Sequence, residues 1–226
     1  MASKPPSAGI RLPMPIWDLP TRLFHWVLVG LVAFSYFSAQ YNKMDLHLLS
    51  GYAVLALLIF RVVWGFIGSD TARFGHFLKS PLAALRHLRH FFRREPDAQV
   101  GHNEAGGWMV IGLLLLLAAQ VATGLCANDD GTTEGPLVKY ISKALSDRLS
   151  GWHSLIINIL LVAIAGHVLA VIGYAVFKGH DLVRPMITGR KRLPAATPAP
   201  GMTRPIVALV VLLVAAAIAF TVGRLI

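Results

Sequence analysis

Five long apolar stretches divide this chain, and their length constrains its fold more than any other feature. A helix needs roughly 20 apolar residues to cross the roughly 30 Å hydrocarbon layer of a membrane. None of the stretches alternates like a barrel strand, so each is predicted to be a transmembrane helix. Hydrophobic residues make up 55% of the 226 residues and charged ones 14%, which argues against an ordinary soluble domain. The helices are expected at about 21–40, 46–67, 107–126, 151–177 and 205–226.

The predicted fold class is therefore an all-α integral membrane protein with two parts. Residues 1–187 form a transmembrane domain of four helices, and residues 205–226 form a fifth, C-terminal anchor helix. The intervening segment 188–204 is rich in Pro, Ala and basic residues, which predicts a linker.

The basic residues that give the net charge of +10 are distributed as in a membrane protein and not as on a nucleic-acid-binding surface. If the N-terminus is cytoplasmic, 16 of the 21 Lys and Arg residues fall on the cytoplasmic side, as the positive-inside rule expects. We therefore predict a cytoplasmic N-terminus, a periplasmic C-terminus and no nucleic-acid partner. The five basic residues left outside are Lys43, Lys139, Lys143, Arg148 and Arg224.

Two features limit the alternatives. The first apolar stretch resembles a secretory signal in its basic flank and in the small residues Ser38 and Ala39, but its length and aromatics favour a retained helix. Cys126 is the only cysteine, so this chain alone forms no disulfide, no iron–sulfur cluster and no CxxCH attachment for covalent haem.

The long second connection contains FLKSPLAALRHLRHFFRR, in which apolar residues recur every three or four positions among arginines. This pattern is typical of an amphipathic helix on the inner leaflet, and a solvated basic loop is an equal alternative. The segment NDDGTTEGP predicts a surface loop on the outer side.

Five further histidines lie in connections or at helix ends, and we expect His87 and His90 to face solvent. The five are His76, His87, His90, His102 and His180.

Four histidines lie within or at the ends of the predicted helices, where each needs a partner or a wet cavity. His153 and His167 are fourteen residues apart on the fourth helix, so they share one face and lie about 21 Å apart along it. The topology pairs His25 with His167 in the cytoplasmic half and His47 with His153 in the outer half. Facing imidazoles are the ligand set of a six-coordinate haem, so two non-covalent b-type haems are predicted. A proton relay, a transporter site and interhelical hydrogen bonding remain alternatives.

Three segments resemble one family. PTRLFHWVLVGLVAFSYFSAQ, LHLLSGYAVLALLIFRVVWGFIG and WHSLIINILLVAIAGHVLAVIGYAVFKGHDLVRPMITG are similar to the bacterial cytochrome b561 family and the related b-type cytochrome subunit of nickel-iron hydrogenases. The resemblance runs from about Ile16 to Gly189. It implies a four-helix bundle with two haems b, one bound by His25 and His167 and the other by His47 and His153. The fifth helix departs from this four-helix pattern.

The expected function is electron transfer through the bacterial inner membrane, between the quinone pool and a periplasmic redox partner, either a cytochrome c or a dehydrogenase or hydrogenase subunit. The alternatives are a stand-alone superoxide/quinone oxidoreductase of the same family and a haem-free proton-coupled transporter. Arg22 and Arg61 end their helices on the inner side and are candidates for binding haem propionates, with positive-inside anchoring as the other reading. No motif for nucleotide binding, zinc hydrolysis or a catalytic nucleophile is present, so no catalytic residue is predicted.

Overall fold

The computed structural model describes residues 10–89, 91–131 and 133–225. Within them, five helices are long and apolar enough to cross a membrane, which confirms the predicted fold class. Residues 1–9, with Lys4, and the predicted positions His90 and Ile226 lie outside the described residues. The long helices are α1 (Leu19–Gln40), α2 (Met44–Ile67), α5 (Glu104–Gly124), α6 (Lys143–Gly173) and α8 (Pro205–Gly223).

Polar caps set where these helices begin. Asp18 accepts a hydrogen bond from the Thr21 amide at 2.7 Å, and Asn103 and Ser142 cap α5 and α6 in the same way. The Ser142 cap starts α6 at Lys143, earlier than the apolar pattern indicates, because the first two turns of this helix are polar and lie beyond the apolar span. At its other end α6 continues into a π-helical turn, Tyr174–Lys178.

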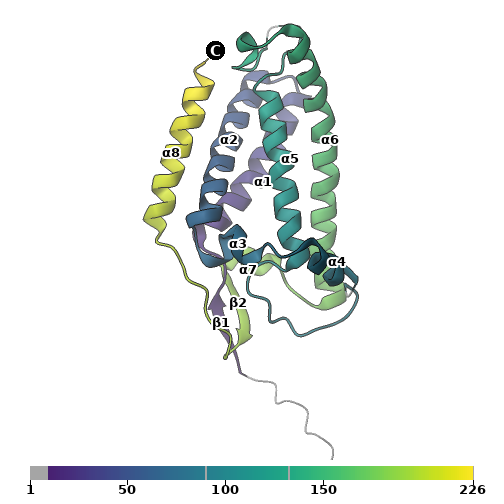
Figure 1. Cartoon of the computed structure of the whole chain (residues 1–226), viewed down its shortest axis with the longest axis vertical. Coiled ribbons are helices and arrows are strands. Elements are labelled where there is room, and N and C mark those ends of the chain that lie inside the picture. The colour runs from purple at the N-terminus through teal and green to yellow at the C-terminus, as the bar shows by residue number, and fades with distance from the viewer. Residues whose placement is uncertain (1–9, 90, 132, 226) are drawn as a thin grey trace, which may run out of the picture.

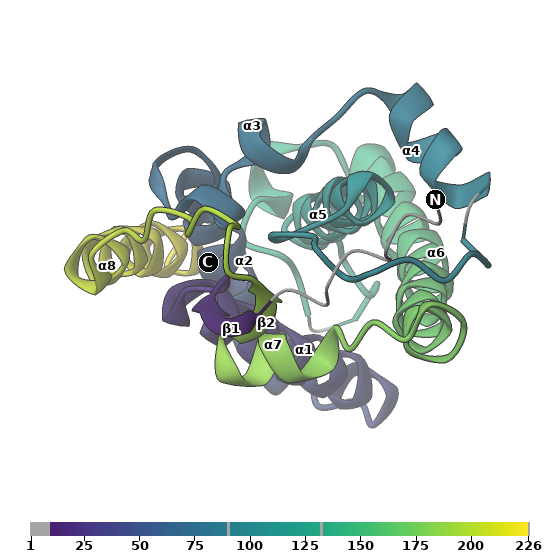
Figure 2. The same ribbon diagram turned by 90° about the horizontal axis from the view of Figure 1, so that it is seen from below.

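The helices form two pairs and an outer helix. α1 packs against α2 and α5 packs against α6, while α2 joins the pairs by packing against α5. α8 lies on the outside of α2, away from α6 (Figures 1 and 2). Buried Ala208, Ala215 and Ala219 line the α2-facing side of α8, and small residues let the two helix backbones approach closely.

A two-stranded antiparallel ribbon stands at one end of the bundle, which we call the ribbon end (Figure 1). Strand β1 (Arg11–Pro15) precedes α1, and β2 (Arg190–Pro194) follows α6 and the short helix α7 (Val183–Thr188). Arg11 pairs with Pro194 and Pro15 with Arg190. Part of the expected linker is therefore a strand. The ribbon joins the start of the first helix to the end of the fourth outside the apolar region.

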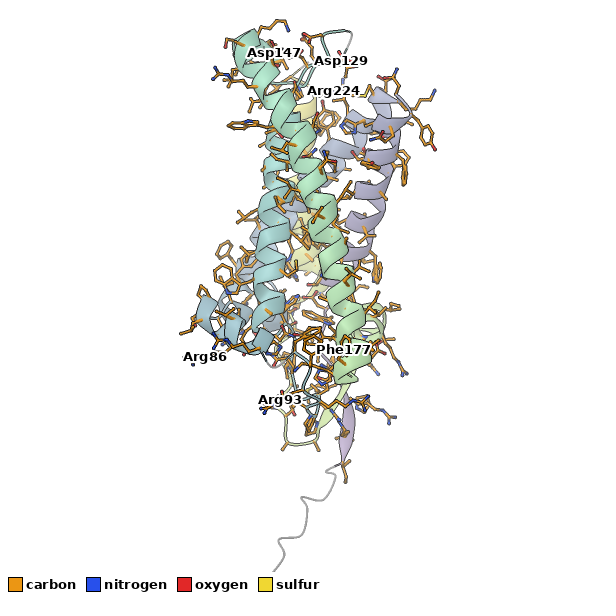
Figure 3. All side chains as sticks on the ribbon, turned by 90° about the vertical axis from the view of Figure 1, so that its right-hand side faces the viewer. Arg86, Arg93, Asp129, Asp147, Phe177 and Arg224 are labelled. Atoms are coloured by element: carbon orange, nitrogen blue, oxygen red, sulfur yellow. The ribbon has the colours of Figure 1, made fainter. Side chains whose placement is uncertain are left out.

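The opposite end, which we call the loop end, carries the connection between α5 and α6, and Asp129, Asp147 and Arg224 lie there (Figure 3). The long second connection lies at the ribbon end and contains a 3₁₀ turn, Asp70–Ala72, and the helices α3 (Phe74–Phe77) and α4 (Pro81–Arg89). Helix α4 falls where the amphipathic pattern predicts one, and its Leu82 and Leu85 are exposed. The two alternatives for this segment were an amphipathic helix and a solvated basic loop, and the structure contains the helix.

Candidate functional site

The four predicted histidines form two facing pairs, one in each half of the bundle. His25 on α1 faces His167 on α6 at the ribbon end, with ring centroids 6.5 Å apart and planes at 59°. His47 on α2 faces His153 on α6 toward the loop end, with centroids 6.0 Å apart and planes at 86°. The structure thus brings together the pairs that the topology predicts, and α6 contributes one ring to each.

The ring separations fit one metal ion between each pair. Metal–imidazole bonds of about 2.0 Å on opposite sides of one ion place two ring centroids roughly 6 Å apart. In the described part of the chain, no group of three His, Cys, Asp or Glu side chains could hold a metal ion. The histidines lie two by two, an arrangement that would suit an iron whose other ligands come from a porphyrin.

Hydrogen bonds at the loop end orient both imidazoles. His47 donates from Nδ1 to the Ser35 carbonyl at 2.9 Å, and His153 donates from Nδ1 to the Gln120 carbonyl at 2.9 Å. Because a carbonyl only accepts, the proton is assigned to Nδ1 and the lone pair to Nε2. Histidines that bind metals usually donate their other ring N–H to such an acceptor. The Gln120 amide donates to the lone pair on His153 Nε2 at 3.1 Å, which agrees with this assignment of the proton.

The rings of the ribbon-end pair face each other across helices that do not otherwise touch closely. Within the described residues, α1 and α6 do not pack along their length. They are held in place indirectly, because Trp26 Nε1 on α1 donates to the Met186 carbonyl of α7 at 3.2 Å and the Arg22 guanidinium donates to the Ile187 carbonyl. The hydrogen bonds to α7 thus hold the ends of α1 and α6 in place although the two helices do not pack along their length.

Within the part of the chain that the structure describes, several buried polar atoms at the ribbon end have no hydrogen-bond partner. They include Arg22 Nε, His25 Nδ1, Arg61 Nη1 and His102 Nδ1. Buried polar groups are normally hydrogen-bonded, and an unpaired buried guanidinium nitrogen is costly. Arg61 is 3% exposed and packs 4.8 Å above the Phe74 ring. A polar, anionic group placed beside this pair would satisfy these donors, and the propionates of a haem are such groups.

His102 joins this site from the connection before α5. Its ring packs at 4.7 Å from that of Trp17 and 4.8 Å from that of Phe77. Burial, followed by the charge of Arg61, lowers the pKa of His102 to about 3, so the imidazole is neutral at physiological pH. The sequence placed His102 in a connection and offered no periodic signal that would mark it as part of the site.

Comparison with protein families identifies the chain. The family model described as prokaryotic cytochrome b561 matches residues 16–189. The chain belongs to the prokaryotic cytochrome b561 family. Searches of curated proteins and of solved structures returned no match. The match spans both histidine pairs and ends before α8, so the fifth helix lies outside the region that defines the family.

Family membership makes this protein a multi-pass membrane cytochrome that binds b-type haem and takes part in transmembrane electron transfer. Each facing histidine pair offers two imidazoles, the kind of ligand that holds a haem iron. One expectation was wrong. His87 does not simply face solvent, because its ring is bonded on one side to Glu104 and on the other to Tyr174.

Proposed function

We propose that this cytochrome holds two haems b, one between His25 and His167 and one between His47 and His153. The observation that carries this proposal is the presence of two facing histidine pairs, each with one member on α6. In both pairs the ring separation suits a single iron. A haem bound by two imidazoles supplies reversible one-electron chemistry and leaves no open position for oxygen.

The chain's own residues would bind and orient the cofactors. The carbonyls of Ser35 and Gln120 hold the loop-end imidazoles through Nδ1, which leaves Nε2 as the nitrogen that would bind iron. At the ribbon end, Arg22 and Arg61 supply unpaired guanidinium nitrogens for haem propionates. The apolar helices around both sites exclude water and keep the local dielectric low.

We further propose that the ribbon end faces the cytoplasm. Strands β1 and β2, which begin at Arg11 and Arg190, lie there (Figure 1), as do Arg86 and Arg93 (Figure 3) and most of the other described basic residues, in keeping with the positive-inside rule. Electrons would then pass between a periplasmic redox partner at the loop end and a quinone at the ribbon end. That partner would be a cytochrome c or a dehydrogenase or hydrogenase subunit.

The first test is a visible spectrum of the purified protein, oxidised and reduced, with the extracted haem counted per chain. We expect a low-spin b-type spectrum and two non-covalent haems per polypeptide. A colourless protein from cells with an adequate haem supply would contradict the proposal and favour a transporter that uses its histidines for protons.

The ligand assignment predicts that the two sites are lost independently. His167→Ala should remove the ribbon-end haem and leave one haem per chain, because His47 and His153 are untouched. His47→Ala is the matched variant and should also leave one haem, the other of the two. Retention of both haems in either variant would refute the pairing.

A further inference from the structure

A cluster of ionisable side chains lies at the ribbon end between α4, the start of α5 and the π-helical turn that follows α6. We call it the α4 cluster, and it is made of His87, Glu95, Glu104, Tyr174 and Lys178. His87 Nδ1 lies 3.1 Å from Glu104 Oε2, and His87 Nε2 lies 2.7 Å from the Tyr174 hydroxyl. A carboxylate only accepts, so His87 donates from Nδ1 to Glu104 and accepts at Nε2 from Tyr174.

One side of this cluster reaches water. An open cleft of about 300 Å³ is lined by Ala83, Arg86 and four of the five cluster residues. Exposure falls along the chain of hydrogen bonds, from 32% for the Glu104 side chain to 23% for His87 and 6% for Tyr174. The three groups therefore lead from solvent to the protein interior.

The other side points toward the ribbon-end histidine pair. Tyr174 follows His167 by seven residues, which places it on the same face of α6, two turns or about 10 Å away. Its hydroxyl also bonds the Asn103 side chain. Asn103 follows His102, which packs beside Trp17 near the same pair. Tyr174 opens the π-helical turn, a feature found often at functional sites.

We propose that Glu104, His87 and Tyr174 form a proton-transfer relay that connects the aqueous cleft to a quinone bound at the ribbon end. This inference rests on the proposed function. Reduction of the quinone takes two electrons from the haems and two protons, and each pass of the relay delivers one proton. Tyr174 gives its hydroxyl proton to the reduced quinone oxygen and becomes a tyrosinate. A proton from water in the cleft then binds His87 at Nε2, which the hydroxyl has left, and the Glu104 carboxylate stabilises the imidazolium so formed. The imidazolium gives this Nε2 proton to the tyrosinate and returns to the neutral ring with its proton on Nδ1.

The charges around His87 suit this role. Burial lowers the pKa of His87, while the neighbouring carboxylate of Glu104 raises it. Lys178 lowers it further, Glu95 raises it and His180 lowers it, and Arg86 lies on the same helix. The opposing charges leave the imidazole neutral near pH 7 and able to take up and release a proton within one cycle.

The alternative is that the cluster only fastens α4 to the bundle, where Lys178 is 2% exposed and lies 3.9 Å from Glu95. The test must therefore separate proton transfer from folding. The haems of the purified holoprotein are reduced with a stoichiometric amount of dithionite. The protein is then mixed rapidly with either a short-chain quinone or ferricyanide, which accepts electrons without protons. Haem oxidation and proton uptake, followed with a pH indicator, are recorded together.

Tyr174→Phe keeps the ring contact with Phe91 and removes only the hydroxyl. We expect haem oxidation by quinone, with its proton uptake, to slow by about tenfold or more, while oxidation by ferricyanide and both haem midpoint potentials stay as in the unchanged protein. Glu104→Gln should act in the same direction and should shift the pH profile of the quinone reaction. Tyr140→Phe, at an exposed tyrosine near the loop end, is the matched control and should change neither rate.

The possible failures are distinguishable. If the unchanged protein holds haem and reduces quinone, and the variants do so at the same rate, the relay is overturned and the proposed function stands. Equal slowing with both oxidants also overturns it, because that result indicates structural damage. If the unchanged protein binds no haem or fails to reduce quinone, the proposed function falls and the relay falls with it.

Discussion

At the scale of single residues, Arg61 is a buried charge at the ribbon end. Its guanidinium feels the opposite charge of Asp18, whose carboxylate accepts a hydrogen bond from the Trp64 indole at 3.2 Å. Among the described residues, Arg61 Nη1 has no hydrogen-bond partner. The sequence indicated Arg61 only as a basic residue at a helix end. Its burial follows from the packing of Phe74, which comes from the connection after α2 and which no local pattern predicts.

Arg61→Gln should make the ribbon-end haem harder to reduce. Removal of a positive charge disfavours the added electron, and unit charges about 10 Å apart interact by roughly 1–2 kcal/mol at an effective dielectric constant of about 20, so the midpoint potential should fall by roughly 50 mV. A spectroelectrochemical titration measures both haems in one sample. Arg224→Gln at the loop end is the control, and two unchanged potentials in Arg61→Gln would contradict the placement of Arg61 beside the haem.

At the scale of elements, the apolar pattern located every long helix and the pairing of the four histidines. It missed the polar start of α6, where the Ser142 cap and not hydrophobicity decides the boundary. It also missed the ribbon, because β1 contains two prolines, shows no alternation and pairs with a strand far away in the sequence. The contacts of His87 and His102 depend on how α4 and the following loop fold back, so their spacing carried no signal.

The close approach of α5 to α6 yields a test with a matched control. A Cβ at Gly124 would lie 2.7 Å from His153 Cε1, whereas a Cβ at Gly112 on the same helix would meet no atom within 4 Å. We expect Gly124→Ala to displace the His153 ring and to lower the haem content of the loop-end site. Gly112→Ala should retain both haems. Haem counts and reduced spectra of the two variants check this, and equal haem content in both would show that the ring tolerates the shift.

At the scale of the whole molecule, α8 is separate from the cofactor sites. It packs against α2, lies outside the family match and carries none of the four paired histidines. A chain that ends at residue 203 should therefore keep two haems and lose thermal stability, because the close van der Waals packing of Ala208 and Ala215 against α2 is lost. Haem content and the thermal unfolding midpoint test this prediction. Loss of a haem would instead assign α8 a role in cofactor binding.

The ribbon has a consequence for the order in which the two sites are completed during synthesis. The loop-end pair needs residues only as far as His153, so it is complete once about the first third of the 31-residue α6 has been made. The ribbon-end pair lies on α1 and α6, two helices that do not pack on each other. The ribbon that joins their ends forms only when β2 has been translated and pairs with β1. We expect the nascent protein to acquire its loop-end haem first and to finish the ribbon-end site last.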